Sequence, residues 1–124
     1  MQWSDLDQEH RLALLDLAVL GMYADGHLAA VEDRRIDRLL GLLGMVGEVE
    51  RNREYDASVA RVRAHVGDPA AAIEHGVELA SLFRGRDERR WVSDALRDLL
   101  ASDGRVSERE EEFVEAVCDS LEEE

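Results

Sequence analysis

The sequence predicts an all-α domain, and three observations support this prediction. Only one proline occurs in 124 residues, and helix-favouring alanine, leucine, arginine and glutamate are abundant. Apolar residues recur three and four positions apart along most of the chain. No segment shows the strict alternation of a strand, and no linker divides the chain. We therefore expect a single domain over residues 1–124, a compact bundle of about six or seven helices with two pseudo-repeated helix–turn–helix units.

The first helix is expected to run from Ser4, a favourable N-cap residue, to about Tyr23. One apolar stripe follows this segment at helical spacing: Leu12, Leu15, Val19 and Met22. Further apolar residues on either side of the stripe widen it, so we expect this helix to be buried around much of its circumference.

A second helix is expected from about Ala30, with an apolar face of Ile36, Leu39, Leu40 and Leu43. Gly44 and Gly47 are the expected helix terminators, because glycine accepts the positive φ that often follows a helix end. Residues 48–66 are strongly charged and have few apolar anchors, which indicates one or two short helices there.

In the second half of the chain the residues that begin and end helices are easier to identify. Asp68 and Pro69 predict a helix start, with Asp68 as N-cap and Pro69 at the first helical position. Gly85 is expected to end that helix, and the next two helices are expected to begin near Asp87 and Ser107. Their apolar faces are Val92, Leu96, Leu99 and Leu100, then Phe113, Val114, Val117 and Leu121, and the single Cys118 is expected to be a buried core residue in the last helix.

The charge balance narrows the choice of partners. Twenty-nine acidic residues against fifteen basic ones give a formal net charge of −14. Such a surface repels phosphate backbones and anionic membranes, so we expect no nucleic acid and no direct membrane insertion, but protein partners. The polar N-terminus is unlike a signal peptide, and no apolar run reaches the length of about 18 residues that a membrane span needs, so the expected location is the cytoplasm.

One short pattern occurs twice. Asp25-Gly26 is followed by Leu28 and Glu32, and Asp103-Gly104 is followed by Val106 and Glu110. A shift of 78 residues superimposes the copies and keeps the apolar positions in phase. The sequence therefore predicts one helix–turn–helix unit used twice, with its acidic residues at fixed spacing.

The pattern matches the second half of an EF-hand loop, in which Asp, Gly, an aliphatic residue and Glu stand at loop positions five, six, eight and twelve. Positions one and three would fall on Gly21 and Tyr23 in the first copy, which offer no carboxylate. A complete calcium loop is therefore not expected. The remaining hypothesis is a weak Ca²⁺ or Mg²⁺ site, formed where the two copies converge, with these metal ligands: Asp25, Glu32, Asp103 and Glu110.

A purely structural interpretation of the pattern stays open beside the metal site. Glycine can reverse the chain after a helix, and aspartate can accept hydrogen bonds from turn amides. Ser107 and Glu110 form a capping box, which explains Glu110 without a ligand. Ala29, the equivalent of Ser107, cannot cap, so Glu32 is less well explained by structure alone.

Two Asp-Gly…Glu units in a small all-helical chain resemble the tellurite-resistance TerB-like family. The resemblance spans nearly the whole chain and rests on Tyr23–Leu28 with Glu32 and on Ala101–Ser107 with Glu110. It implies a compact helical bundle with an acidic face, a link to bacterial stress response, cation binding at the four motif acids and no established enzymatic activity. Ala29 departs from the polar cap usual in the family, which puts a symmetric site in doubt.

Other patterns give no catalytic constellation. The histidines, at 10, 27, 65 and 75, lack zinc-protease spacing, and the serines lack a nucleophile-elbow context. An arginine cluster around Gly85 suits an anionic ligand or neighbouring acids: Arg84, Arg86, Arg89 and Arg90. The resulting prediction is a non-enzymatic interaction or scaffold module; the alternatives are a calcium-responsive EF-hand-like sensor, a subunit of a larger stress or defence complex, and a metal-assisted hydrolase.

Overall fold

The computed structural model describes residues 7–22, 37–38, 40–41, 44, 47–65, 68–100 and 108–122. Within these ranges the chain forms five α-helices, one short 3₁₀ helix and no strand, which confirms the all-α prediction. The elements are α1 (Gln8–Met22), α3 (Glu48–Val62), the 3₁₀ helix η2 (Arg63–His65), α4 (Pro69–Ala80), α5 (Arg86–Leu100) and α6 (Glu108–Glu122). Four residues of the expected second helix, at 37, 38, 40 and 41, are helical; a total of six or seven helices stays a prediction.

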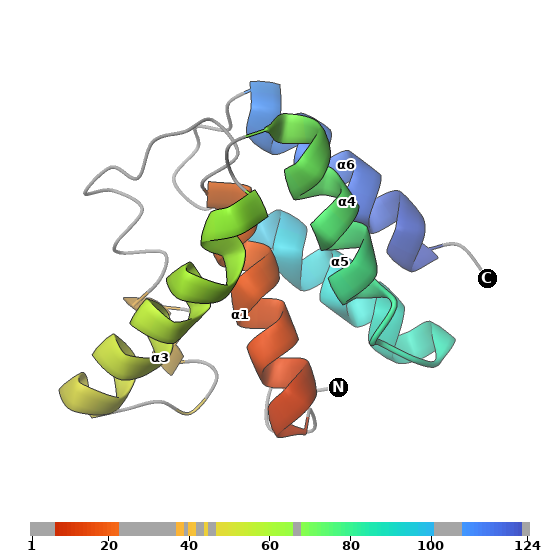
Figure 1. The fold of residues 1–124 in the computed structure, drawn as a ribbon. Coiled ribbons are helices and arrows are strands. Elements are labelled where there is room, and N and C mark those ends of the chain that lie inside the picture. The colour runs from red at the N-terminus through yellow and green to blue at the C-terminus, as the bar shows by residue number, and fades with distance from the viewer. Residues whose placement is uncertain are drawn as a thin grey trace.

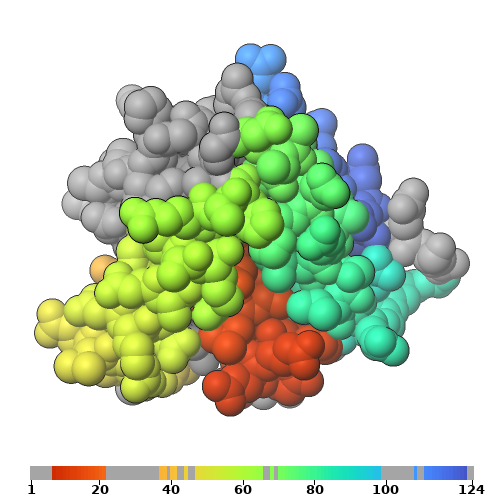
Figure 2. Space-filling model, viewed as in Figure 1, coloured from red at the N-terminus to blue at the C-terminus, as the bar shows by residue number. Residues whose placement is uncertain are grey.

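Helix α1 is the centre of the bundle. It packs against α3 on one side and against α4, α5 and α6 on the other (Figure 1). All side chains from Ala13 to Leu20 are buried, as expected for a helix with a wide apolar surface. In Figure 2 only the N-terminal part of α1 reaches the face shown, between α3 and the start of α5.

The start of α1 differs from the prediction. The helix begins at Gln8, and Asp7 is its N-cap: the His10 backbone N–H donates to Asp7 Oδ1 at 2.9 Å. Ser4 was therefore the wrong cap. Both residues are good N-cap types, and Asp7 lies directly before the first helical residue of α1.

The segment before α3 shows glycine in two different roles. Gly44 has a φ of 87° and its N–H bonds the Gly41 carbonyl at 3.1 Å, so its predicted role in ending a helix is confirmed. Gly47 instead has extended backbone angles and is the N-cap of α3, not a terminator. Helix α3 is a single helix of 15 residues, longer and more regular than the expected short pieces.

The predicted start of α4 is confirmed: Asp68 accepts a hydrogen bond from the Ala70 N–H at 3.1 Å, and Pro69 is the first helical residue. The predicted end is wrong, because α4 ends at Ala80 with Ser81 as its C-cap. Gly85, with a φ of 86°, directly precedes α5, and its carbonyl accepts a hydrogen bond from the Arg89 N–H at 3.1 Å. Helix α4 then approaches α6 closely at Gly76, where an added Cβ would lie 2.8 Å from the Phe113 ring. Glycine is required there by contact, not by backbone conformation.

Aliphatic side chains form most of the core, together with two phenylalanines. The fully buried large side chains include Phe83, Phe113, Leu14, Leu15, Leu17, Leu20, Leu40, Leu96 and Leu121. Cys118 is a free thiol in this core, as predicted, and its Sγ lies 3.6 Å from the Ser93 carbonyl oxygen. Leu40 joins the same cluster, so the segment between α1 and α3 contributes to the core.

Helices α1 and α5 have matching bounds. Each has 15 residues, and a shift of 78 residues places Gln8 on Arg86 and Met22 on Leu100. The two helices also pack against each other. Both Asp-Gly patterns of the predicted repeat lie outside the described residues, so the pseudo-repeat stays a prediction.

Candidate functional site

The four predicted metal ligands lie at the limits of the described structure. Asp25, Glu32 and Asp103 lie outside the described residues, and Glu110 is in the first turn of α6 without a described side chain. The second Asp-Gly turn connects α5 to α6, two helices that pack on each other. Across the described ranges no group of three or more histidine, cysteine, aspartate or glutamate side chains is arranged to hold a metal ion.

Helices α1 and α5 meet through an unusual pair of residues. His10 Nδ1 lies 2.6 Å from Glu88 Oε1, and the two side chains are only 19% and 17% exposed. The imidazole also lies against the Phe83 ring, with centroids 5.2 Å apart. The two residues are 78 positions apart, the same interval that superimposes the two Asp-Gly patterns in the sequence.

An ion pair between the buried Asp16 carboxylate and the partly exposed Arg61 connects α3 to α1. The Asp16 carboxylate, 6% exposed, accepts hydrogen bonds from Arg61 Nε and Nη2, both at 2.8 Å, and from Ser58 Oγ at 2.6 Å. The hydrogen bond to Asp16 is the main cause of a raised pKa of the Arg61 guanidinium, against an opposing effect of burial. This two-pronged geometry fixes both the distance and the rotation of α3 relative to α1.

The network around Asp16 is suited to holding helices together, not to catalysis. Ser58 is fully buried, so its hydroxyl cannot reach a substrate. The sequence carried a signal that was missed: Asp16 stands between Leu15 and Leu17 in a run of apolar residues. A carboxylate in such a position needs a cationic partner when it is buried.

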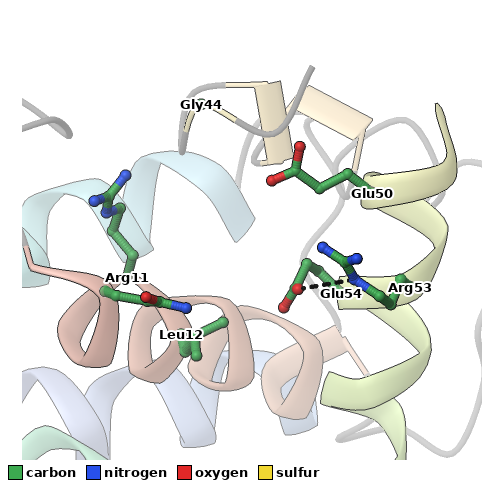
Figure 3. A pocket seen from close by; sticks show the side chains of 7 residues that line it. Arg11, Leu12, Gly44, Glu50, Arg53 and Glu54 are labelled. Carbon is green, nitrogen blue, oxygen red and sulfur yellow. Dashed lines mark ion pairs between the residues drawn. The ribbon is translucent and has the colours of Figure 1, made fainter. Parts of the chain in front are cut away.

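Next to this network the seam between α1 and α3 opens into a pocket of about 270 Å³ (Figure 3). Its walls come from the N-terminal half of α1, the turn before α3 and the first two turns of α3. The lining residues are Gln8, Arg11, Leu12, Gly44, Glu50, Arg53 and Glu54.

Charged side chains stand on both walls of the pocket, a cation on the α1 wall and two carboxylates with one cation on the α3 wall. Figure 3 shows Arg11 on the α1 side and the carboxylates of Glu50 and Glu54 on the α3 side. Arg53 Nε lies 3.4 Å from Glu54 Oε1, in a pair in which Arg53 is 68% exposed. The sequence did not predict this site, because it requires two helices about 40 residues apart to be brought side by side.

Two further histidines connect η2 to α4. The rings of His65 and His75 stack with centroids 3.9 Å apart and planes 13° apart, and His75 Nδ1 lies 3.6 Å from Glu78 Oε2. Together with His10, these are the histidines whose side chains are described. His27, in the first Asp-Gly turn, lies outside the described residues.

The arginine cluster around Gly85 is partly structural. Arg89 Nη2 donates to the Ser120 carbonyl at 2.6 Å, which satisfies a carbonyl in the last turn of α6. Arg84, Arg86 and Arg90 are exposed. Near the same helix pair, a hydrogen bond toward Cys118 is the main cause of a raised pKa of Arg97.

Comparison with known proteins finds no matching family model, no matching curated protein and no matching solved structure. The resemblance to the TerB-like family therefore rests on the motif residues alone. None of the helices in the described part of the chain is long and apolar enough to cross a membrane.

Proposed function

We propose that this chain is a non-enzymatic helical interaction module that binds a divalent cation weakly at its two Asp-Gly turns. The ligands would be Asp25 and Glu32 from the first turn and Asp103 and Glu110 from the second. This is the function that the resemblance to the TerB-like family implies. The net charge of −14 favours cations and protein partners with a basic surface.

The observation that carries the proposal is the contact between His10 and Glu88. In a molecule built from two similar units related by a twofold axis, equivalent residues meet each other only near that axis. His10 and Glu88 are equivalent under the 78-residue shift and lie 2.6 Å apart. The equal lengths of α1 and α5 support the same relation.

This relation bears on where the two turns lie. Each Asp-Gly turn follows the C-terminal end of one of the paired helices, α1 or α5, and both of these ends lie on the same side of the bundle in Figure 1. Such an arrangement favours two turns close enough for their carboxylates to share one cation. Four carboxylate groups from two turns, completed by water, suit Mg²⁺ or Ca²⁺ at millimolar affinity.

Isothermal titration calorimetry of the full chain with Ca²⁺, Mg²⁺, Mn²⁺ and Zn²⁺ tests the proposal. We expect binding with a dissociation constant of about 1 mM for Ca²⁺ or Mg²⁺. Asp25→Asn with Glu32→Gln should weaken binding about tenfold, and so should Asp103→Asn with Glu110→Gln, because one shared site needs both turns.

The matched control replaces two exposed acids of α6, Glu115→Gln with Asp119→Asn, which changes the net charge equally and should leave binding intact. No heat and no change in melting temperature at about 10 mM metal would refute the cation site. Binding selective for Ca²⁺ together with a large change in the circular dichroism spectrum would favour the sensor instead.

A further inference from the structure

The pocket between α1 and α3 has the charge arrangement of a site for a dipolar molecule. Arg11 lies on one wall, and Glu50 and Glu54 lie on the other (Figure 3). The described residues that line the pocket lie on α1, on α3 and at Gly44, so this proposal is argued from other residues than the proposed cation function. Its volume of about 270 Å³ lies just below the range typical of pockets for drug-sized ligands. A molecule smaller than such ligands therefore fits it.

The acidic wall is suited to an ammonium group. Glu50 and Glu54 are one helical turn apart on α3 and both contribute to the pocket. Like charges at this spacing repel each other, so a cation between them relieves that repulsion as well as adding its own attraction. Arg53 lies on the same wall and pairs with Glu54 at 3.4 Å, so the ammonium group of a ligand competes with Arg53 there; Arg53 is 68% exposed, which weakens this pair.

The opposite wall is suited to a carboxylate. A guanidinium presents five N–H donors in a planar fork, so Arg11 can hold a carboxylate in addition to the interaction it already makes. Leu12 adds an apolar surface between the two walls (Figure 3). One turn further along the seam, the Asp16–Arg61 pair holds the walls at a fixed separation before any ligand arrives.

We propose that this pocket binds a small zwitterion of the free α-amino acid class. The ammonium group meets Glu50 and Glu54, the carboxylate meets Arg11, and an aliphatic portion contacts Leu12. A ligand with a single charge would pair with the charged groups of one wall only and would gain no ionic contact with the other wall.

The test compares alanine with its two single-charge analogues, propionate and ethylamine, against the full chain. Calorimetry and thermal melting are measured for each, and glycine, leucine, glutamate and arginine extend the panel. We expect alanine or a larger amino acid to bind with a millimolar dissociation constant and each analogue about tenfold more weakly, because each loses one charge-assisted contact.

Substitutions at the pocket then locate the site. Glu50→Gln with Glu54→Gln should weaken amino-acid binding about tenfold. Glu111→Gln with Glu115→Gln is the matched control: it makes the same charge change at the same helical spacing on exposed positions of α6, and it should leave binding unchanged. The single variant Glu50→Gln, at an exposed position, serves if the double variant fails to fold.

Three outcomes would overturn the proposal. The first is that no amino acid of the panel binds at about 20 mM, well above a millimolar dissociation constant. The second is that propionate or ethylamine binds as tightly as alanine, which would mean that a single wall suffices. The third is that the α6 control weakens binding as much as the pocket variant, which would mean that net charge and not the pocket attracts the ligand.

Discussion

Asp16 is the residue whose environment determines most about this fold. Its carboxylate is buried in the centre of α1, and three hydrogen bonds from α3 compensate for its lost hydration. Asp16→Asn removes the charge and turns one oxygen into a donor that faces Arg61. We expect the free energy of unfolding, measured by urea denaturation, to fall by about 2–4 kcal/mol, since Arg61 keeps partial access to water.

The control for this substitution is Asp94→Asn. Asp94 lies 78 residues further along the chain and is exposed on α5. Its substitution should change the free energy of unfolding by no more than about 0.5 kcal/mol. Equal losses at the two positions would mean that the buried network adds no stability.

At this scale the sequence predicts local partners but not distant ones. Asp68 and Pro69 act on the next residues of the chain, so their roles could be predicted from the pattern alone. The partner of Asp16 is Arg61, 45 residues away, and nothing local distinguishes it from the other arginines. The pocket was missed for the same reason, since its two walls come from separate helices.

At the scale of helices, the close approach of α4 to α6 depends on Gly76. A Cβ there would lie 2.8 Å from Phe113 Cε2 and 2.9 Å from Val117 Cγ2, both parts of buried side chains. Gly76→Ala should therefore lower the free energy of unfolding by about 1–3 kcal/mol, although alanine favours helices. Thermal denaturation measures this, and an unchanged or higher stability would show that α4 and α6 separate without cost.

A substitution at the start of α3 is expected to raise the free energy of unfolding. Gly47 is its N-cap, with extended backbone angles and no side chain to accept a hydrogen bond. A Cβ there meets nothing closer than 3.9 Å. Gly47→Ser should raise the free energy of unfolding by about 0.3 kcal/mol, or slightly more through the less flexible unfolded chain. Urea denaturation of the variant checks the sign, and a loss of stability would contradict the assigned cap.

The small number of buried residues in α3 explains why the sequence predicts one or two short helices there and not one helix of 15 residues. The described residues of α3 include only two that are fully buried, Ser58 and Val62. Hydrophobic periodicity is the signal by which helices are recognised in a sequence, and a helix held by an ion pair shows little of it. Helices α5 and α6 bury apolar faces, and the starts predicted near Asp87 and Ser107 lie within one residue of the observed ones.

At the scale of the whole molecule, α1 and α5 correspond in buried positions and differ where they face other elements. Arg11 and Arg89 are equivalent under the 78-residue shift, as are the buried Ala18 and Leu96. Where α1 carries Leu12 against α3, α5 carries the exposed Arg90. The 78-residue shift thus aligns buried positions of α1 and α5, whereas the pocket is formed where α1 meets α3.

The net charge of −14 makes stability depend on salt. Like charges repel one another in the folded chain, and ions screen this repulsion, with a Debye length that falls from about 30 Å at 0.01 M to about 3 Å at 1 M. Raising NaCl from about 0.02 M to about 0.5 M should therefore raise the melting temperature by about 3–6 °C, the equivalent of roughly 1 kcal/mol. A lower melting temperature would mean that surface ion pairs outweigh the repulsion.

The same measurement separates screening from a specific cation site. At equal ionic strength MgCl₂ or CaCl₂ should raise the melting temperature further than NaCl, because a bound ion stabilises only the folded chain. Replacing all four motif acids, Asp25, Glu32, Asp103 and Glu110, by their amides should remove this excess and leave most of the NaCl effect. Replacing four exposed acids of α6 instead should keep the excess: Glu111, Glu112, Glu115 and Asp119. If both sets remove it equally, divalent ions act through the general negative charge, and the paired turns serve the fold alone.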